Sequence, residues 1–191
     1  MFDQCHWINK PARWELGPAG LGVVTDRATD FWRQTHYGFT RHSGHVFGHE
    51  TSGGFTATLR VRGQYRSLYD QAGIMVLLDD ETWVKAGIEI SDGEAMLSSV
   101  LTLGRSDWAT GVFRGDPSDF WIRATVDDGV LRLQASADGQ RWPLIRLAPF
   151  TPAEHYVVGP MCCTPEREGL EVMFSDFVVG PPTRKALHDL S

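Results

Sequence analysis

The segment from residue 83 to residue 90 has polar, aromatic or glycine residues at every second position and apolar residues between them. The alternate set consists of Trp83, Lys85, Gly87 and Glu89. Successive side chains of a β-strand point to opposite faces, so these four share one face. An aromatic ring can lie against the C–H face of a sugar, while a cation and a carboxylate orient its hydroxyl groups. The spacing therefore favours a saccharide-binding surface; the alternative is the solvated face of an outer strand.

Further side chains are needed to complete such a surface. Lys85 and Glu89 lie roughly 13 Å apart along a strand, too far to pair with each other, so their partners must come from neighbouring strands. The predicted ligand-binding set is Gln71, Trp83, Lys85, Glu89, Trp108, Trp121 and Arg123. Packing in the core or at an edge is the alternative for Trp83 and Trp121. If the face is exposed, replacing Lys85 and Glu89 by alanine changes stability by under about 0.5 kcal/mol and weakens saccharide binding about tenfold.

An enzyme that cleaves glycosidic bonds needs two carboxylates a short distance apart, one acting as an acid. The face that carries Glu89 continues with Ser91 and Gly93, so a second carboxylate would have to come from elsewhere. The available candidates are Glu15, Asp70, Asp79 and Asp107. Turn and capping roles are commoner for aspartates in such positions. Hydrolysis therefore remains an alternative, and no catalytic residue is assigned.

Metal and cofactor chemistry have weaker signals. The region from residue 36 to residue 49 contains four histidines, His36, His42, His45 and His49. No pair of them has the fixed spacing of a zinc site, so we assign no metal. The glycine-containing loop at residues 51–54 lacks the lysine and the following helix of a phosphate cradle. We therefore predict no cofactor.

Period-two alternation runs through most of the chain and predicts β-strands. Six strands have a clear apolar face: 55–62, 71–79, 83–90, 97–103, 120–126 and 131–136. Further strands are expected near 31–39, 45–49, 141–147, 155–163 and 169–179. Asp-Gly turns at residues 92–93, 128–129 and 138–139 favour hairpins. About eleven short strands without crossover helices predict two antiparallel sheets packed as a sandwich.

The composition agrees with one folded β-sandwich. The 191 residues are 42% hydrophobic and 22% charged, close to the globular average. We expect one domain over residues 1–191, with frayed ends at about 1–15 and 181–191. Its core should contain Ile74, Val76, Ile88, Leu101, Ile122 and Leu133. The net charge of −6 argues against nucleic acid and anionic membranes as partners, and no apolar run is long enough to cross a bilayer.

The N-terminus and the cysteines bear on location. The first residues lack the basic start and the apolar stretch of a secretory signal. Cys5, Cys162 and Cys163 do not have the spacing of a disulfide framework or a zinc site. We therefore expect a cytoplasmic protein with reduced thiols. In a strand, Cys162 and Cys163 must face opposite sides, so that one lies in the core.

Several motifs follow one another in a fixed order along the chain. They are Asp30-Phe-Trp-Arg-Gln-Thr-His-Tyr-Gly-Phe39, Gly44-His45, Tyr69-Asp-Gln-Ala-Gly-Ile-Met-Val76, Trp83-Val-Lys-Ala-Gly-Ile-Glu89, Ser106-Asp-Trp108 and Val158-Gly-Pro-Met-Cys-Cys-Thr-Pro-Glu-Arg-Glu-Gly169. The chain thereby resembles a concanavalin A-like family of unknown function that includes the fungal regulation-of-enolase protein and bacterial members found beside carbohydrate-degrading genes. The resemblance implies a jelly-roll sandwich of the lectin/glucanase type, whose concave sheet holds sugars in relatives of the fold. It implies no established activity.

Three functional hypotheses follow from these observations. The first is a non-catalytic carbohydrate-binding protein, or an accessory protein of carbohydrate metabolism, that uses the concave sheet. The second is a glycoside hydrolase or lyase of unrecognised type. The third is a protein-interaction module that regulates a metabolic enzyme, as the name of the fungal relative suggests. The expected partners are accordingly a saccharide or another protein.

Overall fold

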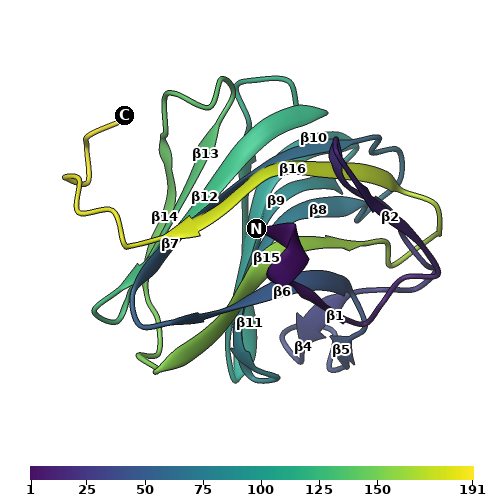
Figure 1. Cartoon of the computed structure of the whole chain (residues 1–191). Helices are drawn as coiled ribbons and strands as arrows, with labels where there is room; N and C mark the ends of the chain where they lie inside the picture. The colour runs from purple at the N-terminus through teal and green to yellow at the C-terminus, as the bar shows by residue number, and fades with distance from the viewer.

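Two seven-stranded antiparallel sheets pack face to face in the computed structural model, which describes residues 1–191 (Figure 1). Sheet A has the order β1 (His6–Ile8), β6 (His45–Ser52), β15 (His155–Cys163), β8 (Gln71–Asp79), β9 (Thr82–Ser91), β10 (Glu94–Leu103), β11 (Arg105–Val112). Sheet B has the order β14 (Leu144–Pro149), β13 (Val130–Ser136), β12 (Asp119–Asp127), β7 (Phe55–Gly63), β16 (Glu171–Gly180), β3 (Gly20–Val24), β2 (Arg13–Gly17). The predicted all-β, two-sheet antiparallel sandwich is confirmed.

Two smaller elements stand outside these sheets. The strands β4 (Phe31–Arg33) and β5 (Thr40–His42) form a separate hairpin. A 3-10 turn, Phe2–Gln4, is the sole helical element. The structure has no helix with the length and hydrophobicity that crossing a bilayer requires.

The main core fills the space between the two sheets and follows the alternation of the sequence. On β7, the alternate residues Phe55, Ala57, Leu59 and Val61 are buried, while the threonine and arginine residues between them are partly exposed. All six residues expected in the core are buried there: Ile74, Val76, Ile88, Leu101, Ile122 and Leu133. Each fully buried large aliphatic side chain contributes about 1.5–3 kcal/mol of transfer free energy. The period-two pattern therefore predicted the main core correctly.

Hairpin turns form at two of the predicted Asp-Gly pairs. Asp92 and Gly93 have φ angles of 54° and 81°, and Asp128 and Gly129 have φ angles of 47° and 73°. Positive φ at both central residues is the geometry of the tight hairpin turn whose twist matches the flanking strands, and aspartate and glycine adopt it readily. These turns connect β9 to β10 and β12 to β13, which pair as neighbours.

The structure differs from the prediction where strands are short. The expected strand at 31–39 is instead the β4–β5 hairpin, and the short strands β1, β2 and β3 were not predicted. The eight-residue strand β11 was also not predicted. Residues 1–15, where frayed ends were expected, contain β1, which pairs with β6, and part of β2, which pairs with β3. The C-terminal residues 181–191 do lie outside both sheets. Strands of three to five residues at a sheet edge are too short to show a period in the sequence.

A second, smaller core lies on the face of sheet A that points away from sheet B. The β4–β5 hairpin covers this face, and Phe31 packs against Trp83 with ring centroids 5.9 Å apart. Its buried residues are Phe31, Trp32, Val46, Met75, Leu77, Trp83, Val100, Met161 and Cys163. Cys162, one residue earlier, belongs to the main core, so the predicted division of the two cysteines between opposite faces is confirmed. The hairpin therefore converts an outer strand face into an interior.

Candidate functional site

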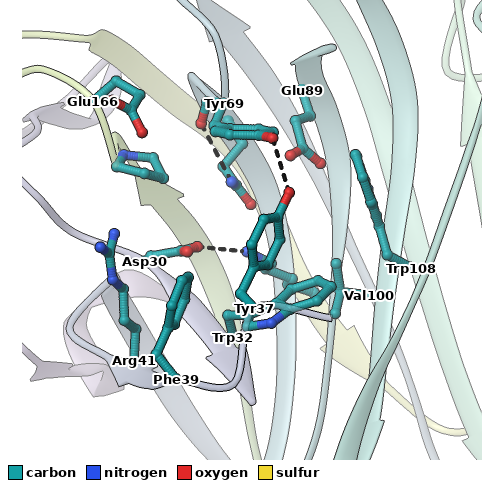
Figure 2. Close-up of a pocket in the computed structure, with 13 residues that line it drawn as sticks. Asp30, Trp32, Tyr37, Phe39, Arg41, Tyr69, Glu89, Val100, Trp108 and Glu166 are labelled. Atoms are coloured by element: carbon teal, nitrogen blue, oxygen red, sulfur yellow. Dashed lines mark hydrogen bonds and ion pairs between the residues drawn. The ribbon is translucent and has the colours of Figure 1, made fainter. Parts of the chain in front are cut away.

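A pocket of about 150 Å³ lies beside this second core, between the β4–β5 hairpin and the outer face of sheet A (Figure 2). Aromatic side chains form much of its wall: Trp32, Tyr37, Phe39, Tyr69 and Trp108. Polar side chains from the sheet and from the residue before β4 complete it: Asp30, Gln71, Lys85 and Glu89. Arg41 and Glu166 also line it, from β5 and from the loop after β15. The lining combines flat rings with buried hydrogen-bonding groups.

A buried ion pair joins the hairpin to the sheet at this pocket. The Lys85 ammonium donates to Asp30 Oδ1 over 3.0 Å, and the two residues are only 4% and 8% exposed. The same carboxylate oxygen accepts the backbone N–H of Phe31 at 2.8 Å. Burial, the largest single effect, lowers the pKa of Lys85, but the charges of Asp30 and other neighbouring groups and the hydrogen bond to Asp30 together outweigh it, so the pKa is raised overall. Lys85 therefore stays charged, and one of its three N–H donors is committed to Asp30.

Glu89 is held by a relay of side chains from three adjacent strands. Ser98 on β10 donates to Glu89 Oε2 at 2.5 Å, and the Trp108 indole N–H on β11 donates to Ser98 Oγ at 3.1 Å. Burial raises the pKa of the Glu89 carboxyl above its ordinary value, while the charge of Lys85 and the hydrogen bond from Ser98 act in the opposite direction. The relay therefore fixes the carboxyl group and the Trp108 ring relative to each other.

Two tyrosines meet at the pocket, with their hydroxyl oxygens 3.2 Å apart (Figure 2). The hydrogen bond between Tyr37 and Tyr69 is the main cause that raises the pKa of Tyr69 to about 12. Tyr69 has a φ of 63°, and Gln34 and His36 in the hairpin turn have φ angles of 62° and 63°. Positive φ is costly for residues with large side chains and concentrates at ligand sites. The backbone around the pocket is therefore held in an unfavourable conformation by its surroundings.

Four of the seven predicted site residues line this pocket: Gln71, Lys85, Glu89 and Trp108. Trp83 shares their face of the sheet but is 1% exposed, because Phe31 and the hairpin cover its ring. The prediction of an exposed stacking platform at Trp83 is therefore wrong. Gly87, between Lys85 and Glu89 on the same face, leaves no open space, since it lies directly opposite Gly73 and the two strands approach each other there.

Trp121 and Arg123 were predicted beside Lys85, and this is also wrong. Both lie on β12, which belongs to sheet B. Trp121 packs under the guanidinium of Arg60, 4.4 Å from its ring centroid, and Arg123 donates to Gln134 at 3.0 Å. Alternation along a strand determines which residues share a face, but it does not determine which sheet the strand joins.

None of the four carboxylates considered for hydrolysis lines the pocket. Asp70 is fully buried, accepts the backbone N–H groups of Arg66 and Ser67, and pairs with Arg167. The others serve elsewhere: Asp107 pairs with Arg146 at 2.6 Å, Asp79 accepts the N–H of Glu81, and Glu15 is exposed on β2. The turn and capping interpretation therefore describes Asp70 and Asp79.

Two of the four histidines, His42 and His45, likewise have separate environments. His45 accepts the N–H of Asp26 and interacts with the backbone oxygen of Asn9, while His42 lies against Phe31 and 3.4 Å from Asp80. His45 and His42 thus have separate hydrogen-bonding and packing partners within the hairpin region.

Nine residues of the pocket were not predicted as site residues, among them Asp30, Trp32, Tyr37, Phe39 and Tyr69. Four of them lie in the segment 30–39, which was expected to be a strand. The density of aromatic residues in that segment is the signal that could have indicated a covering element. The contact between Asp30 and Lys85 spans 55 residues of chain, and local patterns do not contain such contacts.

The charge of Glu89 makes a testable contribution to stability. Glu89→Gln is expected to raise the melting temperature near pH 8 and to have little effect near pH 4. Because the pKa of Glu89 is raised in the folded protein, its contribution to folding stability is fully present below the ordinary pKa of 4.5. This contribution is lost as the pH rises through the pKa of the folded protein. The glutamine keeps an oxygen for Ser98 and carries no charge.

Thermal unfolding of both forms between about pH 4 and pH 8 measures this difference. Glu94→Gln, at an exposed position on β10, is the control and should show no such pH dependence. A variant that loses the same stability at every pH would show that the hydrogen bond to Ser98 matters and the buried charge does not.

Comparison with known proteins places the chain in a family. A family model described as a protein of unknown function (DUF1349) matches residues 7–182. "Regulation of enolase protein 1" of Saccharomyces cerevisiae is 60% identical over 190 residues, which cover all of this chain and 96% of the relative. A crystal structure of a functionally unknown protein from Saccharomyces cerevisiae superposes with a TM-score of 0.94 at 58% identity, covering 95% of this chain and 98% of the other.

Two more distant structures share the fold alone. The GH43 protein BlXynB from Bacillus licheniformis gives a TM-score of 0.68 at 12% identity, over 92% of this chain but only 36% of that one. The exoplasmic/lumenal domain of VIP36, in a Ca²⁺/Man3GlcNAc-bound form, gives 0.59 at 8% identity, over 99% of this chain and 88% of that one. The match of the family model over residues 7–182 and the 60% identity to the yeast relative establish that the chain is a member of the DUF1349 family of proteins of unknown function.

Proposed function

We propose that this protein binds a small saccharide, without cleaving it, in the pocket between the β4–β5 hairpin and sheet A. The observation that carries the proposal is the combination of aromatic walls with a buried polar floor. The rings of Trp32 and Trp108 are nearly perpendicular, at 88°, with centroids 6.4 Å apart, so that they bound two sides of the pocket. A sugar offers C–H faces to such rings and hydroxyl groups to the polar floor.

The size of the pocket selects a small ligand. Its volume of about 150 Å³ is smaller than the roughly 300–1,000 Å³ of pockets that hold drug-sized ligands. One sugar ring fits this scale, whereas an oligosaccharide would have to extend past Arg41 and Glu166. Hydroxyl groups would accept from the free N–H donors of Lys85 and bond to the Glu89 carboxyl, each such bond being worth about 1.5–3 kcal/mol.

The state of the two carboxyl groups favours binding over hydrolysis. Glycoside cleavage uses one carboxyl as an acid and a second as a nucleophile or base. Asp30 already accepts from Lys85 and from the Phe31 backbone, and Glu89 accepts from Ser98. Neither group is free of protein partners, so both can orient hydroxyl groups but neither is poised for attack.

The proposal is tested by replacing a wall residue. Trp108→Ala is expected to weaken binding of the best monosaccharide, found by screening in a calorimeter, by at least about tenfold, because it removes one ring and releases Ser98 from the relay. Trp14→Ala, at a tryptophan that is 37% exposed on β2 and distant from the pocket lining, is the matched control. Equal affinity of the Trp108 variant and the parent, or no monosaccharide binding at all, would overturn the proposal.

Regulation of a metabolic enzyme is a second candidate function. The observation that favours it is 60% identity to a relative whose name is "Regulation of enolase protein 1". In this case the protein would be cytoplasmic and would contact enolase directly. Co-sedimentation of the purified chain with enolase, with and without the saccharide, tests the contact, and separate sedimentation under both conditions would remove this candidate.

A further inference from the structure

A pair of buried arginines lies on the outer face of sheet B, on the opposite side of the molecule from the pocket. Arg123 on β12 and Arg132 on β13 are 9% and 7% exposed. Arg123 pairs in register with Gln134, so Arg132, two residues earlier on β13, is its diagonal neighbour. Diagonal side chains on adjacent strands are about 7–8 Å apart at their bases, within reach of two long side chains. The two guanidinium groups therefore occupy one region of the sheet surface.

Both guanidinium groups keep an N–H donor without a partner. Arg123 donates through Nε to Gln134 and lies 4.3 Å from the ring centroid of Trp142, but its Nη2 is buried and unbonded. Arg132 donates through Nη1 and Nη2 to backbone oxygens, and its Nε is buried and unbonded. Leaving such donors unpaired in a buried place is costly, more so for charged groups. The region therefore lacks an acceptor.

Arg60, on the neighbouring strand β7, is an arginine of this face that forms a two-pronged ion pair within the chain. Its Nε and Nη2 donate to the two carboxylate oxygens of Asp119, both at 2.7 Å. Planar guanidinium groups bind carboxylate and phosphate oxygens in this two-pronged manner. Neither Arg123 nor Arg132 forms an ion pair of this kind within the chain.

The C-terminal residues cover the arginine pair. We define residues 183–190 as the C-terminal strap. One end is fixed where the Thr183 N–H donates to Thr56 Oγ1, and the other where the Trp142 N–H donates to Leu190 O, both at 2.8 Å. Between these ends, the oxygens of Lys185, Ala186 and Leu187 accept from Arg132 at 3.0–3.4 Å.

The strap also brings charged side chains, namely the cations Arg184 and Lys185 and the carboxylate of Asp189. Burial and the charge of Arg132 lower the pKa of Arg123, and the charge of Asp189 on the strap acts against them. The strap thus supplies neutral oxygens and one acidic side chain to the region where two cations lie side by side. The backbone oxygens of the strap accept hydrogen bonds from Arg132 where an anion could accept them, but they carry less negative charge than an anion.

We propose that Arg123 and Arg132 form a binding site for a small oxyanion of the phosphate monoester class, and that the C-terminal strap occupies this site until the anion displaces it. A tetrahedral anion offers several oxygens to two guanidinium forks and satisfies the two unpartnered N–H groups. This site is independent of the saccharide proposal, because it uses the other sheet.

Hydrogen exchange on the full chain tests the displacement with inorganic phosphate as the probe. The backbone amides of Trp142 and Thr183 report whether the strap is in place. The Trp142 N–H donates to Leu190 O at the C-terminal end of the strap, and the Thr183 N–H at its N-terminal end donates to Thr56 Oγ1. Saturating phosphate is expected to accelerate exchange at Trp142 at least about tenfold, since local opening sets the exchange rate. Sodium chloride at equal ionic strength should leave it unchanged. Unchanged protection of both amides in phosphate would overturn the proposal.

Substitutions of the two arginines test where the anion binds. Arg123→Gln and Arg132→Gln are each expected to weaken phosphate binding, followed by calorimetry, at least about tenfold. Arg60→Gln is the matched control on the same face, because Arg60 is already paired with Asp119, and it should bind phosphate as the parent does. Parent-like phosphate affinity in both the Arg123 and the Arg132 variant would contradict the assignment. The exchange measurement needs no variant and decides the case even if a substitution impairs folding.

Discussion

Gly87→Ala is expected to destabilise the protein by more than about 4 kcal/mol, among the largest effects of a single substitution. Gly87 on β9 lies opposite Gly73 on β8, in the middle of sheet A. A Cβ added at Gly87 would lie 2.7 Å from Gly73 Cα and closer still to the backbone oxygen of Ala72. These are backbone atoms of a central strand, so that no side chain can move aside and the strands must separate.

Thermal unfolding measures this loss directly. A destabilisation of 4 kcal/mol corresponds to a melting temperature lower by about 8–16 °C for a chain of this length. Gly17→Ala is the matched control, because Gly17 also lies in a strand and a Cβ there would meet nothing within 4 Å. If the Gly87 variant melted within a few degrees of the parent, the close pairing of β8 and β9 at the two glycines would be incorrect.

Lys85→Ala is expected to cost about 3–5 kcal/mol, because it leaves the buried Asp30 carboxylate without its cation. This replaces the expectation, drawn from an exposed strand face, that substitution here would hardly affect stability. The corresponding fall in melting temperature is about 6–20 °C. Arg146→Ala, which breaks the ion pair with the 66%-exposed Asp107, is the control and should cost no more than about 1 kcal/mol.

A double variant separates charge from packing at this site. Lys85→Met with Asp30→Asn removes both charges, while the asparagine oxygen can still accept the Phe31 N–H. Replacing a buried ion pair by uncharged groups is often nearly neutral, so most of the lost stability should return. If the double variant were as unstable as Lys85→Ala, the effect would arise from lost packing under the hairpin and the uncompensated charge would not explain it.

Part of the candidate site could be predicted from the sequence. The alternation at residues 83–89 placed Lys85 and Glu89 on one face, opposite the main core, and the structure has them on that face. Gln71 and Trp108 were expected with them and line the same pocket. Asp30, Tyr37 and Tyr69 were not, because they reach the pocket from loops and from a hairpin whose own strands have three residues each.

The sequence by itself determined the strand class, the apolar face of six long strands and the position of two hairpin turns. These properties are local: side-chain alternation has a period of two residues, and an Asp-Gly pair selects its turn within four residues. These local properties were sufficient to predict the two-sheet sandwich and the core around Ile88 and Ile122.

The tertiary structure alone decided which polar faces are buried and which strands are neighbours. The outer face of β9 became an interior because the β4–β5 hairpin, about fifty residues upstream, folds over it and places Asp30 against Lys85. Arg123 joined the other sheet because β12 pairs with β7 and β13. Pairing between distant strands depends on the summed packing of both sheets, and an alternating strand carries the same pattern whichever sheet it enters.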